Sequence, residues 1–502
     1  MRFQKIFSSA AVVSAGSFIS RLMGLLRDVI IASLLGAGPI ADALIVAFRL
    51  PNLFRKLFAE GSLSSAVTAT IAHVEAVEGE ARGLSLVRTC LLWTVGILSV
   101  FLLFAEYGSS VLVTVLAPGL TATPDAFAYA NSLLQLTLPY ILCIGLVALF
   151  SGVLHSRNNF TAPALAPLVL NCSLILGAGV AWIFALPVAE TLCISLVLGG
   201  TLQVVLQAVF LSKGMFVYGS WRIFDPDAFL LGKRLIPTVL SGAVFQLSVL
   251  LVTVLASFQT EGTIAKLYFA DRLVQFPLGL IGVAIGIAVL PALSSLAASN
   301  DVQKFGELLS SAVQFTLFLA LPATAGLFVL AHPVLQLFFE RGAFSPEDAA
   351  AAATMLQAFT VGLPAFAVSR PLLSAYYARQ KSRVPLLAGG CSLAVTGGLG
   401  ALLMQFWGGA GLAFAVACGG WVNCGVLYCL LNRQQFFSVQ LRRWNLIYLL
   451  ASVAVGAGCW LVVPYGVISL CSIPIFAAGY LVCLYIGKSP DARQLLALIV
   501  RR

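Results

Sequence analysis

The chain has 502 residues, of which 60% are hydrophobic and 10% are charged, and its mean hydropathy is +1.01. Soluble domains carry about 25% charged residues, so this composition excludes a water-soluble globular protein of this length. The apolar runs are continuous and about 20 residues long, which favours membrane-spanning helices over short alternating β-strands. We therefore predict an all-α polytopic membrane protein.

The formal net charge is +10, from 29 Lys and Arg against 19 Asp and Glu. In a membrane protein the positive-inside rule explains such an excess, so we expect no nucleic-acid partner. The sequence contains no CxxC or Cys/His metal spacing, no P-loop, no dinucleotide-binding GxGxxG and no nucleophile elbow. We therefore expect a protein that is not an enzyme and that holds no cofactor or metal ion.

The apolar runs predict fourteen membrane-spanning helices. In chain order they lie near 7–35, 41–71, 84–106, 128–155, 163–185, 190–212, 229–259, 264–297, 311–331, 348–378, 385–405, 409–431, 445–463 and 467–487. Of the basic residues, 20 fall at the two termini, in the loops on the N-terminal side of the membrane or in the span ends that border these loops, whereas the opposite loops hold only Arg341. By the positive-inside rule, both termini are then cytoplasmic.

The remaining eight basic residues fall inside the predicted spans. They are Arg21, Arg27, Arg49, Arg55, Lys56, Lys266, Arg272 and Arg370. Each would cost roughly 2.5–3.5 kcal/mol at the centre of a bilayer, unless it faces water or a partner. Lys266 lies near a helix end and can extend its amine to the interface. The others mark the region where we expect the function to lie.

Weak self-similarity recurs along the chain at an offset near 222. Arg49 matches Arg272 at an offset of 223, and Arg157 matches Arg379 at 222. Because six spans lie within that offset, the halves are predicted to be parallel repeats related by an axis along the membrane normal. We expect two six-helix lobes, residues 1–222 and 223–440, around a central cavity. Residues 441–502 add two C-terminal helices and a cytoplasmic tail.

The second predicted span carries a row of charges. At about 100° per residue, an uninterrupted helix places Asp42, Arg49, Lys56 and Glu60 on one face, with Arg55 to the side. Pro51 should kink this helix and free a backbone carbonyl, which is tolerated where a helix lines a cavity.

Two other spans contribute to the same set of charges. Arg21 and Asp28 share a face of the first span, with Arg27 to the side, and Asp271 precedes Arg272 in the eighth span. These charges could be buried ion pairs that lock helices together, and we expect this role for the acidic residues. The basic residues outnumber them, which favours a cationic cavity that binds an anion. Because the planar guanidinium fork fits phosphate oxygens, a pyrophosphate group suits the site better than a halide.

Several motifs resemble those of the MurJ (MviN) family of lipid II flippases, within the multidrug/oligosaccharidyl-lipid/polysaccharide exporter superfamily. The resemblance covers the first twelve spans almost continuously. Its most specific parts are Ser20–Asp28 (SRLMGLLRD), Gly36–Gly38 with Asp42, Phe48–Arg55 (FRLPNLFR), Phe58–Gly61 (FAEG), Asn158–Phe160 with Pro163 and Asn171, Tyr268–Leu273 (YFADRL) and Glu340–Phe344 (ERGAF).

The resemblance implies a flippase of the bacterial inner membrane that moves the undecaprenyl-pyrophosphate-linked peptidoglycan precursor, lipid II, to the outer leaflet. Carried over position by position, it implies that Arg21, Arg27, Arg55 and Arg272 are required cavity arginines and that Asp42 is a required aspartate. It also implies that the last two helices form a groove for the lipid tail. A sodium site known in some relatives is not carried over, because 229–259 and 385–405 contain no Asp or Glu.

Other functions remain open at this point. A flippase for another polyprenyl-linked glycan would have a similar pyrophosphate site, and only the motifs argue against it. A multidrug or metabolite antiporter of the same superfamily would be expected to have an acidic cavity for cationic substrates. An enzyme acting on polyprenyl phosphates should show clustered carboxylates or histidines at a membrane face, which the sequence does not indicate. The sequence leaves open whether the protein works alone or with cell-wall synthesis proteins.

Overall fold

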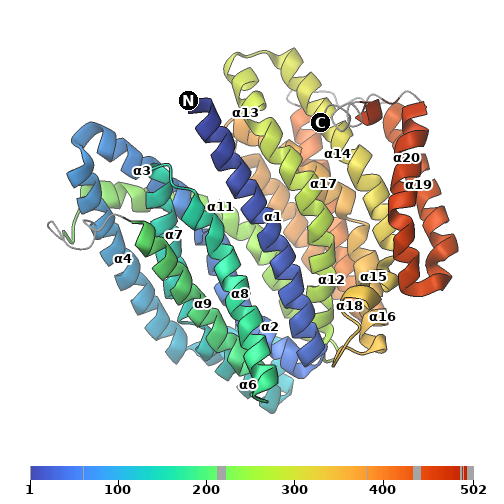
Figure 1. The fold of residues 1–502 in the computed structure, drawn as a ribbon, viewed down its shortest axis with the longest axis horizontal. Helices are drawn as coiled ribbons and strands as arrows, with labels where there is room; N and C mark the ends of the chain where they lie inside the picture. Colours follow the sequence, from blue (N-terminus) through green and yellow to red (C-terminus); the bar gives the residue numbers. More distant parts are fainter. Residues whose placement is uncertain are drawn as a thin grey trace. The chain divides into compact units, whose positions relative to one another are not determined.

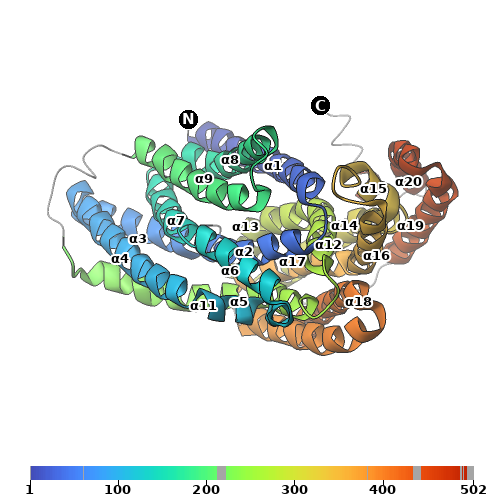
Figure 2. The same cartoon turned by 90° about the horizontal axis from the view of Figure 1, so that it is seen from below.

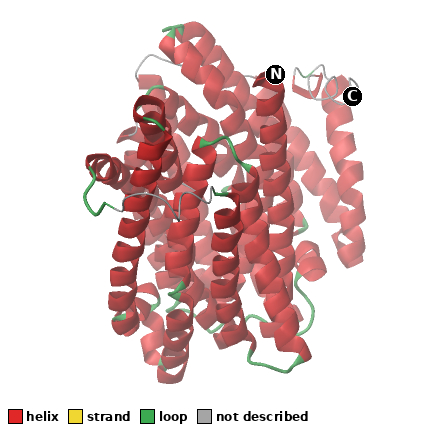
Figure 3. Ribbon diagram, turned by 60° about the vertical axis from the view of Figure 1, so that its left-hand side comes forward, coloured by secondary structure: helices red, strands yellow, loops and turns green. Residues whose placement is uncertain are grey.

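The computed structural model describes residues 2–59, 62–211, 222–381, 383–433, 443–486, 489 and 491–493. These residues form helices joined by short loops, and none of them is in a β-strand (Figure 3). The chain divides into two compact units, Met1–Ala265 and Lys266–Arg502. Each unit is a helical bundle with its own core.

The first unit is built from long helices that pack side by side. Within it, α8 lies between α1 and α9, and α7 packs against α3, α4 and α9 (Figures 1 and 2). Its elements in chain order are α1 (Arg2–Leu35), α2 (Pro39–Phe54), the π-helical turn η1 (Arg55–Ala59), α3 (Ser62–Glu78), α4 (Glu80–Tyr107), α5 (Ser109–Leu116), η2 (Pro118–Ala122), α6 (Pro124–Thr137), α7 (Tyr140–Ser156), α8 (Thr161–Ile183), α9 (Val188–Phe210) and α11 (Pro226–Ala256).

The second unit begins within α12. In it, α14 packs against α13, α17 and α19, and α16 packs against α18. Its elements are α12 (Thr263–Leu278), the π-helical turn η3 (Gly279–Val283), α13 (Ala284–Ala298), α14 (Val302–Val329), α15 (Ala331–Phe338), α16 (Pro346–Thr360), α17 (Leu363–Ala378), α18 (Arg383–Arg433), α19 (Arg443–Val462), η4 (Val463–Ser472) and α20 (Ile473–Ile486).

The element bounds repeat with nearly the same offset as the sequence motifs. Helices α4 and α14 each have 28 residues and start 222 residues apart, at Glu80 and Val302. Helices α2 and α12 each have 16 residues and start 224 residues apart, at Pro39 and Thr263. Each is followed directly by a five-residue π-helical turn. These elements of the first half of the chain therefore recur, in the same order, in the second half.

Among the described residues, eight helices are long and apolar enough to cross a membrane, or nine if the bent pair α16–α17 is one span. This confirms the all-α, membrane-spanning class. Two of the eight combine pairs of spans that the sequence separates: Arg383–Asn432 and Asn445–Tyr485. Gly408 and Gly466 divide them, with φ of 53° and 59°, in the left-handed region that favours glycine. Both glycines lie where the sequence predicts loops.

The boundary between the units lies after Ala265, so α11 belongs to the first unit, whereas the sequence predicts a second lobe that begins at residue 223. Two contacts explain this placement. Helix α11 packs against α3, and Arg82 at the start of α4 binds Asp225 and Asp227, which flank the start of α11, at 2.6 Å each.

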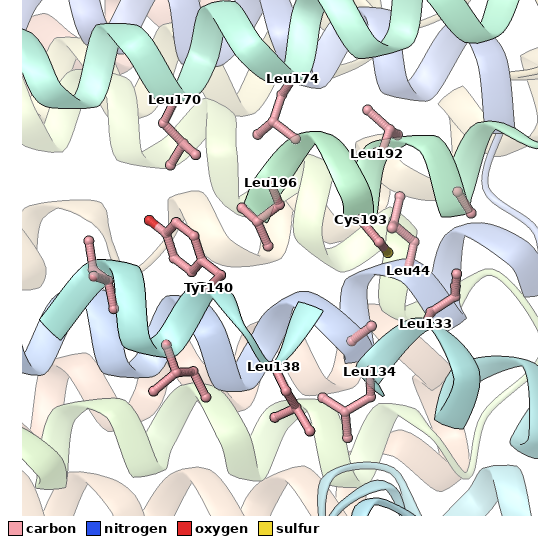
Figure 4. Close-up of a cluster of buried hydrophobic side chains, with 14 of the residues drawn as sticks. Leu44, Leu133, Leu134, Leu138, Tyr140, Leu170, Leu174, Leu192, Cys193 and Leu196 are labelled. Carbon is pink, nitrogen blue, oxygen red and sulfur yellow. The ribbon is translucent and has the colours of Figure 1, made fainter. Parts of the chain in front are cut away.

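The core of the first unit holds α2 in place. Leu44 of α2 is buried together with Leu133 and Leu134 of α6 and with Leu192 and Leu196 of α9 (Figure 4). Because lipid tails are as apolar as leucine, such a cluster stabilises α2 through close van der Waals packing and not through removal of the side chains from water. The inward face of α2 is thereby fixed, which determines where its charged residues point.

Candidate functional site

Two of the charges that the sequence places in the first predicted span, Arg27 and Asp28, lie near the end of α1. Arg27 donates from Nε and Nη2 to Oδ1 of Asp28, at 3.0 and 2.7 Å. Asp28 is only 1% exposed, and a buried carboxylate is stable only when it is paired. Arg21, earlier on the same helix, is exposed.

The Arg27 guanidinium is also held from a neighbouring helix. Its Nη1 donates to Oδ1 of Asn171 on α8 at 3.0 Å. The amide nitrogen of Asn171 donates in turn to the carbonyl of Ser20 at 3.1 Å, so both ends of the amide are engaged. Composition and charge missed Asn171 as a site residue. A signal was available, because it is the only amide side chain in the apolar run 163–185.

Pro51 breaks the regular hydrogen bonding of α2, as the sequence predicts. Proline has no N–H to donate to the carbonyl of Ala47, four residues earlier. The hydroxyl of Thr137 on α6 lies 3.2 Å from that carbonyl and donates to it. The same hydroxyl also lies 2.8 Å from the carbonyl of Leu134, so the two oxygens share its proton. The freed carbonyl is thus supplied with a donor from a neighbouring helix.

The helix changes its winding after Pro51, so it is not the uninterrupted α-helix on which the predicted alignment of charges rests. Residues Arg55–Ala59 form a π-helical turn, in which each turn holds more residues than in an α-helix. Lys56 is therefore rotated away from the position that an uninterrupted α-helix gives it relative to Asp42 and Arg49. Glu60, the fourth residue of the predicted face, lies outside the described residues. Arg49, Arg55 and Lys56 are partly buried.

Arg55 is the first residue of the π-helical turn. Its Nε donates to Oδ1 of Asn52 at 3.4 Å, one turn earlier. The backbone N–H of Arg55 still reaches the carbonyl of Pro51. Arg55 therefore lies where the α-helical winding that contains the proline changes to π-helical winding.

Asp42 binds the start of α12. Its Oδ2 accepts from the backbone N–H of Gly262, and its Oδ1 accepts from that of Ala265, each at 2.7 Å. The first N–H groups of a helix have no partner within it and carry partial positive charge, so a carboxylate there is stabilised. Asp42 is 5% exposed, so these bonds are shielded from water. It therefore acts as a cap for another helix.

Arg272 lies in the second unit, on α12. Its Nη2 donates to the hydroxyl of Tyr268 at 2.7 Å, and its guanidinium carbon lies 4.7 Å from the centre of the Tyr268 ring. The hydrogen bond and the cation–π contact both orient the guanidinium. Asp271 accepts from the amide of Gln275 at 3.4 Å. Tyr268 is a second site residue that charge analysis missed, since its role depends on its place one turn before Arg272.

The charge balance of the first unit's site is positive. Between residues 19 and 61 the chain has five basic residues and three acidic ones, Asp28, Asp42 and Glu60. Basic groups gathered among apolar helices raise the local concentration of anions. Among the described residues, no three His, Cys, Asp or Glu side chains are grouped as metal ligands. Chemically, the arrangement can bind an anion through guanidinium groups.

Comparisons with known proteins agree with one another. The family model "Lipid II flippase MurJ" matches residues 31–480. Proteins named "Probable lipid II flippase MurJ" include that of Rickettsia prowazekii, 32% identical over 87% of this chain and 85% of the relative. That of Haemophilus influenzae is 34% identical over 89% of this chain and 91% of the relative.

Solved structures share the fold. A structure titled "Lipid II flippase MurJ, inward closed conformation" matches with a TM-score of 0.83 and 24% identity, over 97% of this chain and all of that one. An inward-facing multidrug resistance MATE family transporter of the MOP superfamily matches with a TM-score of 0.70 and 15% identity, over 85% of this chain and 98% of that one.

Proposed function

Because the chain belongs to the lipid II flippase MurJ family, we propose that it carries lipid II across the bacterial inner membrane, from the cytoplasmic to the outer leaflet. The observation that carries this proposal is the excess of basic side chains within apolar helices of the first unit. A pyrophosphate-linked lipid has the anion that such groups bind, and its hydrocarbon tail remains in the membrane. The protein is a transporter and not a catalyst.

We assign the pyrophosphate contact to four arginines, Arg21, Arg27, Arg55 and Arg272, because the planar guanidinium fork binds phosphate oxygens in pairs. Arg49 and Lys56 add positive potential that draws the headgroup in. Three of the four arginines have an orienting side chain: Asn171 for Arg27, Asn52 for Arg55 and Tyr268 for Arg272. A guanidinium that is already oriented loses less conformational entropy when the anion binds.

We propose that transport proceeds by alternating access. Two six-helix lobes, residues 1–222 and 223–440, rock around a shared central cavity, which we infer from the repeat and from the family. Asp42 acts as a gate residue, because its bonds to Gly262 and Ala265 can form in one state and break in another. Asp28 holds its neighbour Arg27, and we assign Asp271 and Glu60 to the same ion-pair group.

The remaining features follow from charge and family. Fourteen spans with both termini in the cytoplasm agree with the concentration of basic residues on one side. We assign residues 441–502 to the lipid tail, with α19 and α20 forming a groove for it. A link to cell-wall synthesis proteins would supply and remove the substrate, and we include it as part of the proposal.

The test is lipid II exposure at the outer leaflet of cells depleted of their own flippase. Wild type should restore exposure, and Arg272→Ala, inserted at the same level, should lower it at least about tenfold, equivalent to about 1.4 kcal/mol. The matched control is Lys304→Ala, because Lys304 is exposed and pairs only locally with Asp301 at 3.0 Å. If wild type inserts but fails, another polyprenyl-linked glycan is the substrate. If Arg272→Ala restores lipid II exposure as well as wild type does, Arg272 has a structural role and does not bind the substrate.

A further inference from the structure

Helices α4 and α14 occupy equivalent places in the repeat, but the face that is exposed in α4 is covered by another helix in α14. Leu92 of α4 is 38% exposed, as expected for a side chain that faces lipid. Its equivalent 222 residues later is Gln314 of α14, which is 5% exposed. In the second unit, α19 packs against α14. A polar amide has therefore replaced an apolar side chain where the second half of the chain is covered by the added helices.

The amide of Gln314 binds a carboxylate from the end of the chain. Its nitrogen donates to Oδ2 of Asp491 at 2.6 Å, and the hydroxyl of Tyr448 on α19 lies 2.5 Å from the same oxygen. The Tyr448 hydroxyl is also 2.8 Å from Oγ of Ser489. Asp491 is 6% exposed, and Tyr448 and Ser489 are fully buried. We call Gln314, Tyr448, Ser489 and Asp491 the polar clasp.

Apolar contacts surround the clasp and bring in α20. The ring of Phe318, one turn after Gln314, lies 5.3 Å from the ring of Tyr448 and 5.6 Å from that of Tyr480 on α20. The Tyr480 hydroxyl donates to the carbonyl of Phe318 at 2.9 Å. Beyond α20, the backbone N–H of Ser489 donates to the carbonyl of Leu484 at 2.9 Å. Ser489 and Asp491 thus lie against α14, α19 and α20 together.

The apolar contacts and the hydrogen bonds of the polar clasp affect helix packing in different ways. Apolar side chains alone do not fix how helices meet in a membrane, because lipid tails are as apolar as the side chains they replace. A buried polar network specifies one arrangement, since any shift leaves a donor or an acceptor without its partner. The clasp therefore fixes the register of α19 on α14. Ser489 and Asp491 lie beyond residue 480, where the family match ends.

We propose that Asp491 is a positioning residue for lipid transport: through the clasp it holds α19 and α20 where the hydrocarbon tail of the substrate lies against them. This rests on the proposed function, because it needs a substrate with a long tail. Loosening the clasp should then affect a long-tailed substrate and spare one with the same headgroup and a short tail. A merely structural residue would affect both substrates alike.

The experiment uses the full-length protein in proteoliposomes with two substrates, lipid II and a synthetic analogue with the same headgroup and a farnesyl tail. Asp491→Ala should slow lipid II transport about tenfold and transport of the analogue less than about twofold, as the loss of two buried hydrogen bonds predicts. Asp491→Asn keeps an oxygen that accepts from Gln314 and Tyr448, so it should restore most of the rate. The matched control is Glu307→Ala, an exposed carboxylate on α14.

A second readout tests the clasp without transport. Amide hydrogen exchange in α19 and α20 should quicken in Asp491→Ala and stay unchanged in Glu307→Ala. Equal loss for both substrates, or no loss for either, would overturn the positioning role. If wild type moves neither substrate, the proposed function fails. In that case unchanged exchange in Asp491→Ala would overturn the clasp, whereas quickened exchange would support its structural part.

Discussion

Asp42 and Lys266 occupy the same position in the two halves of the chain, and each binds the first turn of another helix. Each is the fourth residue of a 16-residue helix, α2 for Asp42 and α12 for Lys266. Asp42 accepts from the backbone amides of Gly262 and Ala265. Lys266 donates to Asp348, the third residue of α16, at 3.0 Å. The residue at this position therefore binds the start of another helix in both halves of the chain, although it is negatively charged in the first half and positively charged in the second.

The Asp42 cap leads to a first prediction. In Asp42→Asn, one side-chain oxygen remains to accept, and the negative charge that favours a helix start is lost. Amide exchange at Gly262 and Ala265 should quicken by roughly tenfold, equivalent to about 1.4 kcal/mol of local stability. Hydrogen–deuterium exchange with mass spectrometry over residues 258–270 measures this.

The control for this variant is Asp125→Asn, which removes an exposed acid from the first turn of α6. It should leave exchange over residues 258–270 unchanged. Unaltered exchange in Asp42→Asn would show that the carboxylate does not stabilise the start of α12.

A second prediction concerns pH and the attachment of α11. Burial raises the pKa of the Asp225 carboxyl, but hydrogen bonds from Arg82 and from the backbone amide of Asp227 outweigh it, so this pKa lies below its ordinary value. At pH values above its ordinary pKa of about 3.9, such a carboxyl stabilises the folded state. This contribution is lost as the pH falls through the lowered pKa of the folded state. The attachment should therefore be constant from pH 5 to 8, a range well above both values.

Trp93 reports on this attachment, because its indole N–H donates to the carbonyl of Ile223 at 2.8 Å. In a variant that keeps Trp93 as the only tryptophan, emission should stay constant from pH 8 to 5 and shift only below about pH 4. Arg82→Ala should produce the shifted emission at neutral pH. A transition between pH 5 and 8 that Arg82→Ala abolishes would contradict the prediction.

Tyr268 is the subject of the third prediction. Tyr268→Phe keeps the ring under the Arg272 guanidinium and removes the hydroxyl, whereas Tyr268→Leu removes both contacts. If Tyr268 orients Arg272, lipid II transport should fall about two- to fivefold in the first variant and more in the second, since each contact contributes about 0.5–1.5 kcal/mol. In the Arg272→Ala background, neither Tyr268 substitution should lower lipid II transport any further. Additive losses would mean that Tyr268 acts separately.

Sequence reasoning reached the class of the fold because composition and hydropathy determine it directly. The all-α membrane-spanning fold follows from the long apolar runs. The offset near 222 reappears in element bounds such as those of α4 and α14. Sequence reasoning failed where a local irregularity of the backbone determines the direction of the side chains. The π-helical turn at Arg55–Ala59 has no simple residue signature, so sequence reasoning could not give the orientation of Lys56 relative to Asp42 and Arg49.

The partners of the charged residues were also beyond sequence reasoning. Arg27 and Asp28 are adjacent, and helical spacing sets neighbours about 100° apart. Their pairing needs the long arginine stem to turn back, supported by Asn171 from a helix 144 residues away. Asp42 binds backbone amides, which carry no sequence signal. Such contacts follow from tertiary packing and not from the pattern of a single helix.

Asn171 gives a fourth prediction. Asn171→Asp keeps an acceptor for Arg27 but adds a negative charge that offsets its positive one, so pyrophosphate binding should weaken about tenfold. Asn171→Leu removes the acceptor and frees the guanidinium, and should weaken binding less, by about two- to fivefold, through lost preorganisation. Binding of lipid II to the purified protein measures both. If Asn171→Asp binds as tightly as wild type, Arg27 does not contact the pyrophosphate.

The last prediction links Pro51 to Thr137. Thr137→Val removes the hydroxyl donor and leaves the Ala47 carbonyl without it, which should lower stability by about 0.5–2 kcal/mol. In Pro51→Ala the new backbone N–H can supply that carbonyl through the helix itself. Thr137→Val should then cost less in the Pro51→Ala background, giving a coupling of about 0.5–1 kcal/mol. Thermal unfolding of the four proteins in one detergent measures the cycle.

A cycle with no coupling would mean that the Thr137 hydroxyl serves the carbonyl of Leu134 alone, since both oxygens lie within its reach. The transport assay separates stability from function in the same proteins. Pro51→Ala should straighten α2 and reposition Arg55, which lies four residues after the proline, so transport should fall even though the helix is more stable. Thr137→Val leaves the proline in place, so it should lower stability while transport per folded molecule stays near that of wild type.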